Sequence, residues 1–441
     1  MSINETLGLV MLFLMIPVIF VGFPISFTLL FLALVFGYIG MGPTVFDLLF
    51  FQTIGLMKEE TLAAVPLFIF MGYILEEGGL MERLFRAFQL LLAPVPGALY
   101  IGVLTIATIF GIAAGTVGPT VALMGIMAAP TMTRAGYDVR MSAGTITAGG
   151  TLGILIPPSV MLVVMGPVMG VSVVKLYASS FGPGFVLSGI FIAYVLIRSY
   201  LQPHVGPALP KEQRATSYGF LLKELVIGML PHGFLILATL GTILAGLATP
   251  TEAAAMGALG AFLLSIIYRV FTWKRLRDTC SLTLRQSSMI LFLVVASNVF
   301  GAVFARLGSA NVVTKALLAI PIPPMGMLFV VMALIFLLGW PFEWPAIILV
   351  FVPLLQPVID ALKLDMLWFA TLIAVNLQTA YLSPPVAMAA YYLKGVAPDW
   401  RLSDIYWGMA QFMVLQVIGL ILCIVFPEII LWFPRWFFDR S

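Results

Sequence analysis

Apolar segments long enough to span a membrane alternate with short polar segments along the whole chain of 441 residues. A helix needs about 20 apolar residues to cross the hydrocarbon core of a bilayer. Residues 43–59 and 271–286 have a mixed pattern that is typical of amphipathic helices at the membrane surface. The pattern therefore predicts an all-α polytopic membrane protein. Its ten expected spans are residues 6–20, 23–41, 61–76, 141–170, 182–199, 228–247, 251–269, 287–305, 366–394 and 407–431.

Two further apolar stretches, residues 98–131 and 325–357, are interrupted by Gly- and Pro-rich segments at 111–119 and 339–345. Each half of such a stretch should be roughly 13–15 residues, or about 20 Å as a helix, which is too short to cross. We therefore predict two re-entrant hairpins. Their tips leave backbone groups unpaired, which is tolerated only inside protein or beside a polar cavity.

The breaks in the apolar pattern occur twice. Pro157 and Pro384 each open a proline pair and lie 227 residues apart, and Asp138 and Asp365 are separated by the same interval. We interpret the chain as two copies of one unit, residues 1–200 and 228–441, joined by a polar cytoplasmic linker at 201–227. Paired broken helices in an apolar chain indicate the binding site of a transporter.

The distribution of basic residues predicts the orientation in the membrane. Five crossings in each copy is an odd number, so the second copy must be inverted relative to the first. With these spans, 15 of the 22 Lys and Arg residues lie on one side and 7 on the other. The positive-inside rule makes the richer side cytoplasmic. We therefore expect both termini outside, the first hairpin entering from the cytoplasm and the second from outside.

Composition excludes several classes of function. The chain is 62% hydrophobic and 9% charged, whereas soluble domains have about 25% charged residues. Its net charge of +3 is small and gives no basic patch for nucleic acid. Cys280 and Cys423 are isolated, and His204 and His232 are the only histidines, so neither a disulfide framework nor a histidine-rich metal site is expected.

Catalytic patterns are also missing from the sequence. It contains no recognisable nucleophile–base pair and no phosphate-binding loop, so we expect neither an enzyme nor an organic cofactor. ATP would have to be used on another chain. The pattern instead favours secondary transport driven by an ion gradient.

The two proline pairs mark candidate ion sites. Proline removes a backbone donor and displaces the carbonyl four residues earlier, so Pro157-Pro158 and Pro384-Pro385 should each break a helix and free carbonyl groups. Carbonyl and hydroxyl oxygens at about 2.3–2.6 Å suit a hard cation. The candidate side chains are Thr116 and Thr151 in the first copy and Asn376, Thr379 and Ser383 in the second. Close helix packing is the simpler explanation for any single Gly or Thr, but the doubled arrangement favours binding.

The acidic residues near the breaks fall into two groups. Glu343 lies in the second predicted tip, where a carboxylate at membrane depth indicates an ion or proton pathway. A tip shallow enough for hydration is the alternative. Glu252 follows Thr249-Pro250-Thr251 at a helix start and should have a structural role, because a carboxylate there favours the helix dipole. Asp138 and Asp365 should cap the helices that follow them.

Several sequence blocks together resemble the large membrane subunit of TRAP (tripartite ATP-independent periplasmic) transporters. They are GFPISF at 22–27, VPLFIFMGYILEEGG at 65–79, GTLGILIPPS at 150–159, TPTEAAA at 249–255 and NLQTAYLSPPVA at 376–387. The resemblance implies an elevator-type, sodium-coupled importer in the bacterial inner membrane, surrounded by lipid. It also implies a small membrane subunit with four helices and a periplasmic substrate-binding protein as partners. The implied sodium-binding residues are Gly115, Thr116, Thr151, Gly153, Glu343, Asn376, Thr379 and Ser383.

The chain departs from typical members at both hairpin tips. Ala114 and Thr120 stand where a serine and an aspartate are usual, and Glu343-Trp344-Pro345 stands where an aspartate precedes proline. The WPFEWPA form is similar to a branch that handles small organic acids. A stand-alone sodium/divalent-anion symporter with the same architecture is the alternative function. A channel and an intramembrane enzyme fit less well, since neither rings of pore charges nor catalytic pairs are visible.

Overall fold

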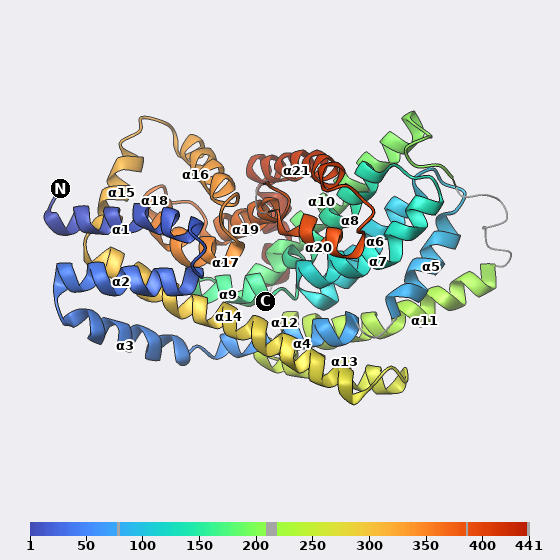
Figure 1. Cartoon of the computed structure of the whole chain (residues 1–441), viewed down its shortest axis with the longest axis horizontal. Coiled ribbons are helices and arrows are strands. Elements are labelled where there is room, and N and C mark those ends of the chain that lie inside the picture. Colours follow the sequence, from blue (N-terminus) through green and yellow to red (C-terminus); the bar gives the residue numbers. More distant parts are fainter. Residues whose placement is uncertain (77–79, 209–217, 385–386, 439–441) are drawn as a thin grey trace.

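The computed structural model describes residues 1–76, 80–208, 218–384 and 387–438, and these residues form helices, turns and loops without any strand. The molecule is elongated in the view of Figure 1. Through residue 201 the helices are α1 (Ile3–Phe20), α2 (Ile25–Met41), α3 (Thr44–Met57), η1 (Glu60–Ala63), α4 (Ala64–Glu76), α5 (Leu80–Leu92), α6 (Ala98–Ala114), α7 (Val117–Arg134), α8 (Val139–Leu155), α9 (Val160–Met169) and α10 (Val173–Leu201).

From residue 218 onward the helices follow a similar order. They are α11 (Tyr218–Ile236), η3 (Leu237–Gly241), α12 (Thr242–Leu244), α13 (Pro250–Ile267), α14 (Trp273–Arg306), α15 (Ser309–Leu318), α16 (Pro324–Leu338), α17 (Trp344–Ala346), η4 (Ile347–Phe351), α18 (Val352–Ala361), α19 (Met366–Leu377), η5 (Gln378–Tyr381), α20 (Met388–Val396), α21 (Leu402–Val425) and α22 (Glu428–Phe438). The all-helical polytopic class predicted from sequence is therefore confirmed for the described residues.

Helices of the two parts pack against each other in exchanged pairs. Helix α2 packs on α14, while α13 packs on α4; α8 packs on α21, while α19 packs on α10. Figure 1 shows α14 running beside α2 at one end and towards α13 at the other. Each of these helices in one copy thus packs on a helix of the other copy, and the corresponding helices form the reverse pair, as in two intertwined repeats. The boundaries proposed for the copies and their linker stay predictions.

The number and length of the spans differ from the sequence-based expectation. Among the described helices, 7 are long and apolar enough to cross a membrane, or 8 if the bent pair α8–α9 is one span. Ten were predicted, but α2 has 17 residues and α4 has 13, so both are shorter than a full span. The hairpin limbs are longer than predicted: α6 has 17 residues, α7 has 18 and Trp344–Ala361 has 18.

Two predicted boundaries are wrong. Residues 271–286 and 287–305 were expected as separate elements, but α14 is one helix of 34 residues. The sequence has neither Gly nor Pro between Trp273 and Phe300, so nothing interrupts the backbone there. The last predicted span, 407–431, ends at Val425, and α22 follows after Pro427 as a separate helix that packs on α10.

The predicted helix caps are confirmed. Asp138 accepts a hydrogen bond from the Met141 backbone N–H at 2.8 Å, and Asp365 accepts one from Trp368 at 2.9 Å. Thr249 and Glu252 form a reciprocal capping box at the start of α13, with Pro250 in the first turn. Helix α8 is buried throughout from Met141 to Leu155, so the Asp138 cap lies at the start of an almost fully enclosed helix.

Candidate functional site

The first proline pair lies where the sequence predicts a helix break. Helix α8 ends at Leu155, Ile156 is extended, and the Pro157–Pro158 peptide bond is cis. Helix α9 then begins at an angle of 44° to α8. The Ser159 hydroxyl donates to the Ile154 carbonyl at 2.5 Å and so compensates one acceptor that the break leaves without a backbone donor.

The tip of the first hairpin, between α6 and α7, rests on this break. Gly115 has a φ of +64°, in the left-handed region that favours glycine. A Cβ atom at Gly115 would lie 2.8 Å from the Pro158 carbonyl oxygen, so glycine is also needed for the close approach. Thr116 follows in an extended conformation, and its carbonyl accepts a hydrogen bond from the Thr120 hydroxyl at 2.7 Å. The structure thus brings Gly115 and Thr116 to the first break, as the sequence predicts.

Gly153 packs against the same hairpin and is not among the residues that line the cavities at the hairpin tips. A Cβ atom at Gly111 of α6 would approach the Gly153 Cα to 2.6 Å, so the backbones of α6 and α8 are in direct contact. Small residues that allow this approach are the usual means of close helix packing in membranes. The contact explains Gly153 by packing alone, and its predicted role in ion binding stays untested.

Thr151 connects the two broken helices. Its hydroxyl contacts the Ala148 carbonyl at 2.8 Å and the Gln378 Oε1 of η5 at 3.3 Å. Gln416 of α21 donates from Nε2 to the Thr151 oxygen at 2.9 Å. All three of these side chains, Thr151, Gln378 and Gln416, are fully buried. Thr151 is therefore the centre of a polar network that joins α8, η5 and α21.

The second break differs in its local structure. Helix α19 ends at Leu377 and continues as the 3₁₀ turn η5. The Thr379 hydroxyl donates to the Asn376 carbonyl at 2.6 Å, and the Ser383 hydroxyl donates to the Thr379 carbonyl at 2.7 Å. Pro384 lies in the turn that follows, whereas Pro385 falls outside the described residues. Asn376, Thr379 and Ser383 are thus brought together within one break.

Asn376 also joins this break to the second hairpin. Its Nδ2 donates to the Met332 carbonyl of α16 at 2.7 Å, while its buried Oδ1 has no hydrogen-bond partner among the described residues. At the end of α16, a Cβ atom on Gly339 would lie 3.1 Å from the Cβ of Ala380 in η5. In each copy, therefore, a glycine at the end of a hairpin limb packs closely against the neighbouring broken helix.

Both hairpin tips face one cavity, which we call the tip cavity. It has a volume of about 290 Å³ and is lined on one side by Gly115–Pro119 and Trp344. On the other side it is lined by Tyr73 of α4 and by Thr279 and Gln286 of α14. The Tyr73 hydroxyl donates to the Gln286 Oε1 at 2.6 Å, which orients this amide beside the cavity.

Glu343 lines an adjoining cavity of about 280 Å³, which we call the Glu343 cavity. It shares Tyr73, Gln286, Trp344 and other residues with the tip cavity. Arg285 also lines it and, among the described residues, is the single basic residue that lines these two cavities. The half-buried Glu343 carboxylate is therefore placed at the second tip beside a cavity that Arg285 and Gln286 also line.

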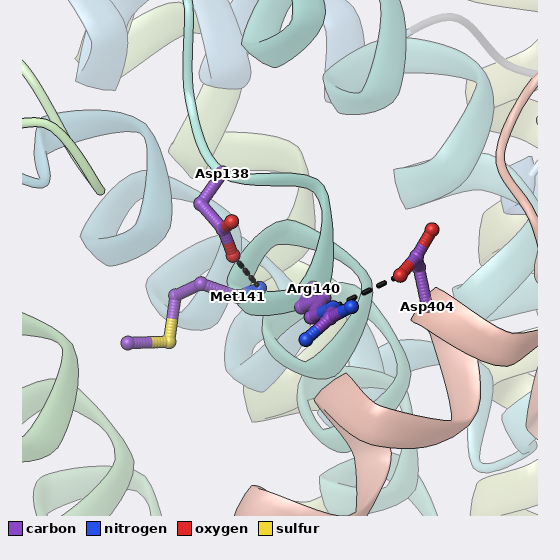
Figure 2. A network of polar contacts seen from close by, with 4 residues as sticks. All are labelled: Asp138, Arg140, Met141 and Asp404. Atoms are coloured by element: carbon purple, nitrogen blue, oxygen red, sulfur yellow. Dashed lines mark hydrogen bonds and ion pairs between the residues drawn. The ribbon is translucent and has the colours of Figure 1, made fainter.

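A surface ion pair holds one end of the α8–α21 contact. Figure 2 shows Arg140, near the start of α8, pointing towards Asp404 of α21; the Nε to Oδ1 distance is 2.9 Å. Asp138 caps the same end of α8 through Met141. Further along, a Cβ atom on Gly408 would collide with the Arg140 carbonyl, so these helices also pack backbone to backbone.

Sequence reasoning missed the two glutamines of the network, Gln378 and Gln416, together with Tyr73 and Gln286. A lone glutamine within an apolar helix was a usable signal, because an amide buried in a membrane protein requires polar partners. Its partner was not predictable, since Thr151 and Gln416 are 265 residues apart.

Comparisons with known proteins agree on one family. Residues 9–429 match the family described as "Tripartite ATP-independent periplasmic transporter, DctM component". A sialic acid TRAP transporter large permease protein of Vibrio cholerae, SiaM, is 29% identical over 95% of this chain and 96% of its own. A C4-dicarboxylate TRAP transporter large permease protein of Rhodobacter capsulatus, DctM, is 27% identical over 97% of this chain and 99% of its own.

Two further comparisons extend this result. An ectoine/5-hydroxyectoine TRAP transporter large permease protein of Ruegeria pomeroyi, UehC, is 28% identical over 95% of this chain and 96% of its own. The crystal structure of the YdaH transporter of Alcanivorax borkumensis superimposes with a TM-score of 0.62 at 14% identity. That match covers 97% of this chain and 98% of the other. At this identity, the structural match supports the fold alone.

Proposed function

Because the chain belongs to the family of DctM components of tripartite ATP-independent periplasmic transporters, we propose that it is the permease subunit of a sodium-coupled importer for a small organic acid. Transport is of the elevator type: the two hairpins and two broken helices carry the substrate past the remaining helices, which act as a scaffold. The observation that carries this proposal is the tip cavity, where both tips face side chains of α4 and α14.

Sodium coupling is supported by the chemistry of the second break. A hydroxyl that donates its proton to a carbonyl keeps its lone pairs for a cation, as Thr379 and Ser383 do. The unpartnered Asn376 Oδ1 adds a buried acceptor beside them. In the first copy the corresponding ligands are Thr116 and Thr151. Oxygen ligands of this kind suit a hard cation.

An acidic substrate is supported by Arg285. A guanidinium group binds a carboxylate through paired hydrogen bonds, and Arg285 is the single cationic side chain lining the Glu343 cavity in the described part of the chain. The named relatives carry sialic acid, C4-dicarboxylates or ectoine, so membership in the family leaves the particular substrate open. The partners we propose are a small four-helix membrane subunit and a periplasmic binding protein.

Uptake into vesicles that contain the chain and both partners tests the function. Imposing a sodium gradient should drive accumulation of the acid, and omitting either partner should abolish it. Full uptake by the chain alone would instead support the stand-alone symporter.

Glu343→Gln should weaken the sodium dependence, because it removes the carboxylate from the second tip. Glu252→Gln is the matched control, since Glu252 belongs to the capping box of α13. Equal sodium dependence in both variants would reject a role for Glu343.

Single cysteines test the proposed orientation. In a background lacking Cys280 and Cys423, Ser2→Cys and Gln202→Cys should react with impermeant reagents from opposite sides of the membrane. We expect Ser2 to be periplasmic and Gln202 cytoplasmic, because the side richer in Lys and Arg is cytoplasmic. Reaction from one side would contradict five crossings in the first copy.

A further inference from the structure

A third cavity lies on a different part of the scaffold. This cavity, which we call the flank cavity, has a volume of about 440 Å³. Gln52 and Gly55 of α3, with Glu59 just after it, line one wall, and Ser297 and Asn298 of α14 line another. The opposite wall is formed by apolar parts of the hairpin and broken helix, including Leu349 and Pro353.

The flank cavity corresponds to the tip cavity through the internal repeat. Gln52, Gly55 and Glu59 each lie 227 residues before a residue that lines the tip cavity, namely Thr279, Leu282 and Gln286. On the hairpins, Ala122, which lines the tip cavity, and Leu349, which lines the flank cavity, are also 227 residues apart. Two surfaces of the scaffold are therefore related positions in the two copies.

The two cavities differ in what faces the scaffold. In the tip cavity the scaffold faces the hairpin tips at Gly115–Pro119 and Trp344. In the flank cavity it faces Leu349 and Pro353, which follow Trp344 of the second tip by about one and a half and two and a half helical turns. Polar scaffold groups are thus set against an apolar flank.

Ser297 shows most clearly that the polar scaffold groups are poorly matched to the apolar side chains they face. The side chain is 0% exposed, and its Oγ has no hydrogen-bond partner among the described residues. A buried hydroxyl without a partner is destabilising, so such a group calls for an explanation. Asn298 and Gln52 line the same cavity and carry further amide groups.

We propose that the flank cavity is the second contact site for the transported acid, used when the hairpins occupy the opposite position. This inference rests on the elevator mechanism proposed above. A displacement of the hairpins by about two and a half helical turns, about 14 Å along a helix axis, would bring Trp344 to the level that Pro353 now occupies. The tips and their bound acid would then face Gln52, Ser297 and Asn298.

The chemistry of the two sites is different. Arg285 lines the Glu343 cavity, whereas no Lys, Arg or His lines the flank cavity among the described residues. Glu59 also lines the flank cavity, so neutral donors from Ser, Asn and Gln would hold the acid in the opposite state against the repulsion of this carboxylate, and more weakly than Arg285 does. Neutral hydrogen bonds are roughly half as strong as those to an ionised partner. With the proposed orientation, the flank cavity lies on the periplasmic side and the arginine on the side of release.

Cross-linking of cysteine pairs tests the displacement without requiring transport. The background is the full chain with Cys280→Ser and Cys423→Ala, co-expressed with the small membrane subunit. Gln52→Cys with Pro353→Cys should cross-link in the arrangement seen here. Gln52→Cys with Trp344→Cys should cross-link only after displacement, and peptide mass spectrometry measures both yields. Failure of the Trp344 pair, while the Pro353 pair reacts, would overturn the proposal.

The contact with the acid is tested in a second pair, Gly55→Cys with Trp344→Cys, which keeps the Gln52 amide; Gly55 also lines the flank cavity, and a Cβ there meets no atom within 4 Å. Pyruvate, succinate and sialic acid are the probes, each added with sodium, and at least one should change the yield severalfold. Adding Ser297→Ala should remove this change. Ser287→Ala is the matched control, because Ser287 is also buried on α14, also has an unpartnered hydroxyl, and lines none of the three cavities.

The outcomes separate this inference from the proposed function. If no probe changes the yield, or if Ser297→Ala and Ser287→Ala behave alike, the flank cavity is not a contact site for the acid. A probe effect that persists without sodium, and that Ser297→Ala removes, would support the flank cavity and reject sodium coupling. A cross-link of the Gly55/Trp344 pair that no probe affects would support the displacement alone and overturn the contact.

Discussion

The two breaks share a position in the repeat but are built from different interactions. In the first, glycines let backbones touch, as at Gly111 and Gly153, and Ser159 compensates the carbonyl of Ile154. In the second, side-chain amides dominate: Asn376 binds a carbonyl of α16, and Gln378 reaches the first break. Apart from the Thr151 network, the first break is therefore held by close backbone packing, whereas the second keeps side-chain amide groups that have no partner among the described residues.

Because of this difference, we expect substitutions at the two breaks to affect stability and ion binding to different extents. A close backbone contact has no spare polar group, so its disruption should mainly affect folding. A buried amide oxygen without a partner keeps a high demand for a ligand, so its removal should mainly affect binding. Substitutions at matched places in the two breaks should therefore give different results.

The largest effect on stability is expected at the glycine contact of the first break. Gly111→Ala places a methyl group where the Gly153 backbone lies, at 2.6 Å from its Cα. Overpacking of this kind costs about 1–3 kcal/mol, so the free energy of unfolding and the melting temperature in detergent should fall. Gly189→Ala on α10 is the control, because a Cβ there meets no atom within 4 Å. Equal melting temperatures for the two variants would contradict a packing role.

The next effect is expected in the second break and should concern sodium more than stability. Asn376→Ala removes the Oδ1 that has no partner among the described residues and also the Nδ2 bond to Met332, so the melting temperature without sodium should fall as well. The sodium concentration that gives half-maximal thermal stabilisation should rise by about tenfold, a loss of about 1.4 kcal/mol in binding. Asn311→Ala changes the same residue type on the exposed face of α15 and should leave this concentration unchanged. A sodium response in Asn376→Ala equal to that of Asn311→Ala would contradict the expected role of the second break in sodium binding.

Particular residues show how far the sequence predicts this site. The proline pairs and the 227-residue interval predict both breaks, because proline and glycine act on the local backbone whatever surrounds them. The tips meet the breaks as predicted, since Gly115 lies against Pro158. The network through Gln378 and Gln416 was not predicted, because its contacts depend on how α21 packs on α8.

Element boundaries failed for a related reason. The division of α14 at residue 286 followed a change in composition, whereas a helix ends only where its backbone is interrupted. The separate helix α22, by contrast, follows a proline at 427 that was visible in the sequence. Local backbone signals were thus more informative about boundaries than polarity was.

A smaller and different effect is expected at the network that joins the breaks. Gln416→Leu removes the donor to Thr151 but also removes a buried Oε1 that has no partner, so the free energy of unfolding should change by less than about 1 kcal/mol. The steepness of the sodium response should nevertheless decrease, because the two breaks lose a shared contact. Gln411→Leu is the control on the same helix, where Gln411 binds Tyr194. A steeper or unchanged response in Gln416→Leu would show that the breaks bind sodium independently.

The smallest effect is expected for the ion pair at the end of α8. The side chains of Arg140 and Asp404 are 55% and 22% exposed, so water and salt screen their attraction. Asp404→Asn should lower the free energy of unfolding by no more than about 1 kcal/mol, and added salt should reduce this difference further. Asp138→Asn should also cost little, since asparagine caps a helix about as well as aspartate. If Asp404→Asn instead destabilised the protein more than Gly111→Ala, the α8–α21 contact would depend on charge rather than on the backbone packing at Gly408, and the view that shape secures the first break would be wrong.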